Sequence, residues 1–226
     1  MGSHARRVLS SLAISLVMVY PVIGQSVPTG RPWGPPAHFP PDENPQFFPT
    51  SVFGAYHDLD ARAYSWYLRS MGEQPLIGAA CVDCPGTYRV LVLPAFSSPV
   101  VVRLTVARDG TAELTAKVGK DDLNPQALAV NGSKTIARDD VESFFRLLNN
   151  ADFWHTPSVQ ADPRYHTFGG TSWLLEGSLE GVYHVTSWIG PRRVPCSDAA
   201  SFLIWDLGRV DLRRLPTQPP ARRRPT

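Results

Sequence analysis

Residues 99–118 carry the pattern that most constrains the fold of this chain. They read PVVVRLTVA, then RDG, then TAELTAKV. In both halves apolar residues occupy every second position, which is the period of a strand with one buried face. Arg108-Asp109-Gly110 joins the halves, and Gly110 can take the positive φ that a tight turn needs. The stretch therefore predicts an antiparallel hairpin that is apolar inside and polar outside.

A second hairpin is predicted for residues 173–188, which read WLLEGSLEGVYHVTSW. Two registers are open. A three-residue loop at residues 179–181 places Glu176 opposite His184, whereas a two-residue turn places Glu176 opposite Val185. Because side chains alternate between the faces of a strand, this choice decides whether the acid and the imidazole face each other. In the three-residue register Trp173 and Tyr183 share one face, and we expect that face in the core.

Further periodic segments complete the predicted set of elements. TYRVLVL (87–93) is typical of a strand, and ALAVNGSKTIA (127–137) indicates a strand or a small hairpin turning at Asn131-Gly132. Three segments have helical spacing or helix-end signals. They are residues 57–76, with a stripe of Tyr64, Tyr67, Leu68 and Met71 that ends at Gly72; residues 137–154, with Val141, Phe144, Phe145 and Leu148; and residues 199–210, capped by Ser197 or Asp198.

The order of these elements predicts the fold class. Strands joined by short turns and followed by helices favour an antiparallel sheet with helices on one face. We therefore expect an α+β domain over residues 51–212. It should contain about five to six strands and two to three helices, packed mainly on one face of the sheet.

The two ends of the chain have compositions unlike that of the domain. Residues 1–24 combine Arg6 and Arg7 with an apolar run, which is typical of a secretory signal peptide cleaved before Gln25; a retained membrane anchor is the alternative. Residues 25–50 are proline-rich and predict an extended linker. Residues 213–226 hold five arginines and no acid, and predict a disordered basic tail. We expect an exported protein, periplasmic or extracellular, that contacts a membrane only if the signal segment stays uncleaved.

Charge and cysteine usage exclude several classes of function. The formal net charge is only +2, and the basic excess sits in the tail, so no specific nucleic-acid binding is expected. Cys81 and Cys84 have C-x-x-C spacing, but a turn and a strand follow, where a thioredoxin-type site needs a helix. We expect a disulfide between two of Cys81, Cys84 and Cys196, and we expect neither a metal nor a cofactor.

Glu176 and His184 are the only candidate catalytic residues. An opposed carboxylate and imidazole can act as a general base with its orienting group. Such chemistry also needs a nucleophile or bound water, an oxyanion donor and a pocket, and no motif supplies them. Candidate binding residues are spread over a helix, two loops and the second hairpin. They are Trp66, His155, His166 and Trp188, and the two additional histidines would have to converge with His184 and Glu176 to hold a metal.

Four segments together resemble a set of uncharacterised bacterial exported proteins. They are YSWYLRSMGEQPL, YRVLVLPAFSSPVVVRL, ADFWHTP and WLLEGSLEGVYHV with the IGP that follows, and the likeness spans roughly residues 50–208. The resemblance implies export and a β-β-α-β-β-α-like domain, and it brings no catalytic residue with it. We therefore expect a non-enzymatic binding or structural domain of the cell envelope or exterior, with an envelope protein or ligand as partner. The alternative is a secreted hydrolase or metalloenzyme that uses His184 and Glu176.

Overall fold

The computed structural model describes seven segments of the chain, which all belong to one compact unit. They are residues 46–54, 58–78, 86–95, 97–121, 125–160, 170–190 and 194–212. The predicted signal peptide and basic tail lie outside them. No helix in the described segments is long and apolar enough to cross a membrane.

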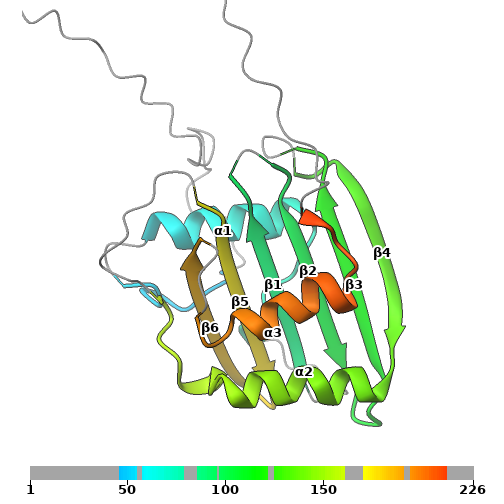
Figure 1. Cartoon of the computed structure of the whole chain (residues 1–226). Helices are drawn as coiled ribbons and strands as arrows, with labels where there is room; N and C mark the ends of the chain where they lie inside the picture. Colours follow the sequence, from blue (N-terminus) through cyan, green and yellow to red (C-terminus); the bar gives the residue numbers. More distant parts are fainter. Residues whose placement is uncertain are drawn as a thin grey trace, which may run out of the picture. The chain divides into compact units, whose positions relative to one another are not determined.

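Six strands form one antiparallel sheet in the order β4-β3-β2-β1-β5-β6 (Figure 1). The strands are β1 (Gly86–Leu93), β2 (Val100–Val106), β3 (Ala112–Gly119), β4 (Leu128–Ile136), β5 (Ser172–Leu179) and β6 (Val182–Ile189). The first four follow each other as a meander, and β5 returns to pair with the free side of β1. The sheet therefore has two edges, β4 and β6, and the predicted hairpins at 99–118 and 173–188 are both present.

Helices cover both faces of the sheet. Figure 1 shows α2 (Arg138–Asn150) and α3 (Ser197–Ser201) in front of the sheet and α1 (Asp58–Ser70) behind it. A π-helix, η2 (Phe202–Leu207), continues α3, and a short 3₁₀ turn, η1 (Phe153–His155), follows α2. The predicted α+β class, with an antiparallel sheet and helices mainly on one face, is confirmed.

The face under α2, α3 and η2 holds the larger core. Alternate residues of β1 and β2, such as Val90 and Val102, are fully buried beneath Phe144 of α2 and Leu203 of η2. Tyr88 of β1 belongs to this core, with its ring 5.3 Å from that of Phe144. Burial raises the pKa of the Tyr88 phenol to about 12, so this tyrosine is neutral and acts as a packing residue.

The opposite face is a second core rather than the open polar face that the alternation predicted. Leu68 of α1 and Met71, the residue that follows α1, pack there against Leu91 of β1. Phe47 and Phe48, at the end of the segment predicted as a linker, are 1% and 3% exposed in the same cluster. The folded part of the chain therefore includes residues that precede position 51.

Local signals predicted the end of α1, the cap of α3 and a strand or small hairpin at residues 127–137. Gly72 ends α1 with a φ of +69°, and the Glu73 N–H donates to the Leu68 carbonyl, which is the hydrogen bond of a Schellman motif. The predicted cap of α3 is wrong, because neither Ser197 nor Asp198 caps it and the hydroxyl of Ser197 donates to the Val194 carbonyl. Residues 127–137 contain the single strand β4 and no turn.

Candidate functional site

The hairpin of β5 and β6 closes with a two-residue turn. Glu180 and Gly181 have φ of +49° and +84°, the positive values that a type I′ turn requires. Glu176 therefore lies opposite Val185, and the three-residue register is wrong. His184 projects to the other face of the sheet, so Glu176 and His184 cannot act as a catalytic pair.

His184 lies on the α2 face among aromatic rings. Its ring is 5.0 Å from Phe153 and 6.4 Å from Trp154, and its Nε2 atom is 3.3 Å from the hydroxyl of Thr156. Burial lowers the pKa of His184, so the imidazole is neutral at pH 7. It packs directly opposite Gly177 of β5. These contacts hold the ring in place, and none of the described partners is an acid that could orient it as a base.

Glu176 lies on the α1 face, in a buried ion pair with Arg89 of β1. The Arg89 Nε and Nη2 atoms are 2.7 and 2.6 Å from one carboxylate oxygen, and Tyr183 donates to the other over 2.8 Å. Arg89 also donates to the Gln74 carbonyl, over 2.7 Å. Both charged side chains are 0% exposed. Phe47 covers the guanidinium, with its ring centroid 5.7 Å away.

Glu73 connects this pair to two further cations. Its carboxylate is 2.7 Å from Lys117 Nζ, 2.8 Å from Arg103 Nη1 and 3.4 Å from Arg89 Nη1. Lys117 also donates to the Met71 carbonyl, just beyond the end of α1, over 2.9 Å. Because the Schellman motif fixes Glu73 directly after α1, the network fastens the end of this helix to strands β1, β2 and β3.

This buried network is built for packing and not for turnover. Burial raises the pKa of Glu176, against the lowering effect of Arg89, and it also raises the pKa of Tyr183. Perturbed pKa values are frequent at active sites, but they are equally a property of structural ion-pair networks. A substrate must touch the reacting group, and here both Glu176 and Arg89 are 0% exposed, with Phe47 over the guanidinium. The network is therefore a structural ion-pair network that holds the end of α1 on the sheet.

The other candidate residues are dispersed. His155 is exposed and pairs with Asp152, Trp66 packs edge-on against Tyr67, and Trp188 is 3% exposed beneath the stacked ring of Trp173. His166 lies outside the described residues. Within the described segments, no group of three histidine, cysteine or acidic side chains could hold a metal.

The three cysteines are only partly covered by the structure. Cys196 is a free, fully buried thiol, and burial raises its pKa. Cys81 and Cys84 lie outside the described residues. The expected disulfide between two of the three cysteines stays a prediction.

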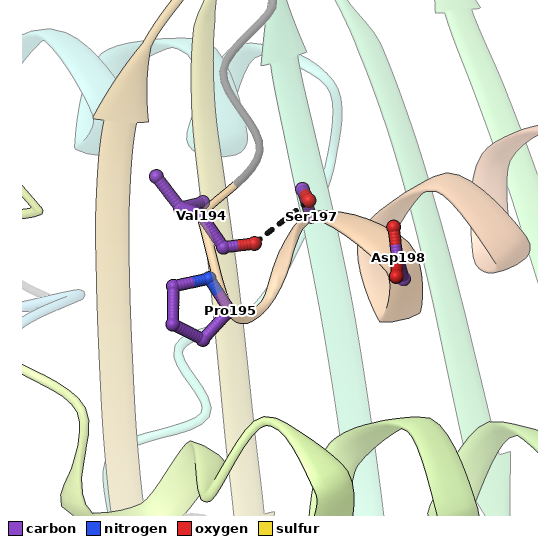
Figure 2. A pocket seen from close by; sticks show the side chains of 4 residues that line it. All are labelled: Val194, Pro195, Ser197 and Asp198. Atoms are coloured by element: carbon purple, nitrogen blue, oxygen red, sulfur yellow. Dashed lines mark hydrogen bonds between the residues drawn. The ribbon is translucent and has the colours of Figure 1, made fainter.

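One open hollow lies at the start of α3 (Figure 2). Its lining residues are Val194, Pro195, Ser197 and Asp198. The Ser197 hydroxyl is turned toward the Val194 carbonyl, to which it donates over 2.7 Å. This hydroxyl is engaged within its own turn, and none of the described lining residues is a histidine that could activate it.

The two edges of the sheet differ in how they are covered. Along β6, residues 158–160 form a short parallel bridge in which Ser187 accepts from the Gln160 N–H over 2.8 Å and donates to the Ser158 carbonyl over 2.9 Å. The hydroxyl of Thr186 also donates to the Pro157 carbonyl. Covering an edge with a loop is one way in which proteins prevent unwanted strand pairing.

The β4 edge is exposed along nearly its whole length. Residues 129–135 are all exposed, between partly buried Leu128 and buried Ile136. Val130 is 48% exposed. None of the described segments pairs with β4 on the side away from β3. This edge therefore presents outward-facing backbone donors and acceptors to solvent.

Sequence reasoning missed both the buried network and the bare edge. A signal for the edge was present, because AVNGSKT at residues 129–135 is poor in large apolar residues on either face. No protein-family model matches the chain, and no curated protein is similar to it. The resemblance to exported proteins stays a prediction.

Proposed function

We propose that this chain is an exported, non-enzymatic binding domain that takes an extended protein segment as an added strand along β4. The observation that carries the proposal is the run of exposed residues 129–135 on an edge strand that no other described segment pairs with on its outer side. Export is supported by the apolar segment behind Arg6 and Arg7. The cell envelope or exterior is the compartment that follows from it.

Strand addition fits the chemistry of this edge. Backbone hydrogen bonds to a free edge supply affinity, and alternate side chains supply specificity. Charged side chains and prolines on an edge strand hinder its pairing with another chain. Residues 129–135 contain one charged residue, Lys134, and no proline. The partner chemistry is therefore an extended peptide with few charges, whose side chains alternate over the two faces.

Two proline variants of the full chain test the proposal. Successive backbone N–H groups along a strand point to opposite sides. One of the two variants, Gly132→Pro or Ser133→Pro, therefore removes an N–H that donates to β3, and the other removes an N–H that points outward. Thermal melting identifies the outward one, because it leaves the melting temperature nearly unchanged. We expect peptides selected from a displayed library of extended ten-residue sequences to lose binding to that variant by at least about tenfold.

The matching alanine variant is the control, since Gly132→Ala or Ser133→Ala keeps the backbone N–H. Selected peptides should bind the alanine variant as well as the unchanged chain. Peptides that bind the outward proline variant with unchanged affinity would show that β4 is not the binding edge, and the proposal would be abandoned.

A further inference from the structure

We propose that the strand added to β4 is β4 of a second copy, so that two chains form a twelve-stranded sheet about a two-fold axis through Gly132. The inference rests on the proposed function, because it requires β4 to accept a strand. Two-fold symmetry pairs a strand with itself in antiparallel orientation, and β4 already pairs in that orientation with β3.

The sequence of β4 is complementary to itself in this register. Gly132 meets Gly132 of the partner subunit, and a Cβ built at this position touches nothing within 4 Å. Asn131 then faces Ser133 of the partner subunit, so that an amide lies opposite a hydroxyl. Val130 faces Lys134 of the partner subunit, whose aliphatic stem can cover the exposed valine.

The charges of β4 permit this pairing. Lys134 is the only charged residue of the strand. In the proposed register the two copies of Lys134 are four residues apart along the strands, which is about 14 Å at a rise of about 3.4 Å per residue. That separation exceeds the Debye length of about 8 Å at physiological ionic strength, so their repulsion is largely screened.

Disulfide trapping tests the register with a matched pair of variants. In Gly132→Cys the two new cysteines face each other with Cα atoms about 4.5–5.5 Å apart, which a disulfide can bridge. In Ser133→Cys they are offset by two residues, roughly 8 Å apart, which is too far to bridge. Under mild oxidation of the full chain, we expect a covalent dimer at least about tenfold faster from Gly132→Cys.

A second pair of variants tests the contact between Val130 and Lys134 of the partner subunit without an added cysteine. Val130→Lys places like charges opposite each other twice per dimer, and Val130→Glu places opposite charges there. In sedimentation equilibrium we expect the dimer dissociation constant to rise about fivefold or more in the first variant and to fall in the second. Val130 is half exposed, so both variants should fold.

Several outcomes would contradict the proposed dimer. They are equal oxidation rates for Gly132→Cys and Ser133→Cys, a dissociation constant that does not respond to charge at position 130, and a protein that stays monomeric at every concentration. If library peptides still bound in a proline-sensitive manner, the proposed function would stand and only the second copy would be rejected. If peptide binding failed as well, both would fall.

Discussion

Replacing Arg89 by methionine is expected to lower the free energy of unfolding by about 3–5 kcal/mol, the usual effect of breaking a buried ion pair. Glu176 would then keep only the hydroxyl of Tyr183, at a site with no exposure to water. Glu73 would keep Arg103 and Lys117. Urea denaturation, followed by its midpoint and slope, measures the change.

The control and the rescue variant also replace charged residues by methionine. Arg138→Met removes an arginine that is 82% exposed and paired with Glu142, so we expect a change of less than about 1 kcal/mol. The double variant Arg89→Met with Glu176→Met leaves no unpaired charge at this pair. It should regain more than half of the free energy of unfolding that Arg89→Met loses. An Arg89→Met protein as stable as Arg138→Met would show that the network does not fasten the fold.

Replacing Phe153 by alanine is the second change with a large expected effect, a loss of about 3–5 kcal/mol. The ring is 1% exposed and packs against His184 and Trp154, with ring centroids 5.0 Å apart in both contacts. It also fills the space over Gly177, where a Cβ would come within 2.8 Å of its edge. Thermal or urea denaturation measures the loss, and Val182→Ala, at a site 61% exposed, is the control.

A double-mutant cycle with Gly177 makes this prediction specific to the packing. Gly177→Ala alone should cost about 1–3 kcal/mol, because the new methyl collides with the rings of Phe153 and Tyr88. In Phe153→Ala the same methyl enters the vacated space. The double variant should therefore lose less free energy of unfolding than the sum of the two single losses. Strict additivity would mean that Phe153 and Gly177 are not in contact.

Much of the fold could be predicted because its elements have simple periods. Alternation over residues 99–118 gives the first hairpin, and helical spacing gives the buried stripe of Tyr64 and Leu68 in α1 with Met71 directly after it. The second core was missed, although β1 is apolar on both sides, with Leu91 as well as Val90. A strand of that composition indicates two covered faces, and it places Arg89 in the interior.

The site could not be predicted because it depends on register and strand order. Glu180 is a non-glycine residue at positive φ, which is uncommon, and the sequence therefore did not single out the two-residue turn. Partners such as Glu73 and Arg103 come from separate elements and meet only through the tertiary fold. That β4 ends the sheet follows from the pairing of β5 with β1, a contact that no local pattern encodes.

The central claim is that β4 is the edge at which this protein binds, and amide hydrogen exchange measured strand by strand tests it most directly. The full chain, diluted until it is monomeric, would be compared alone and saturated with a peptide selected for binding. We predict that about every second amide of residues 129–135 exchanges at least about tenfold more slowly in the complex, because only the outward N–H groups gain a partner. Unchanged exchange in β4, with new protection around His184 or along β6, would contradict the claim.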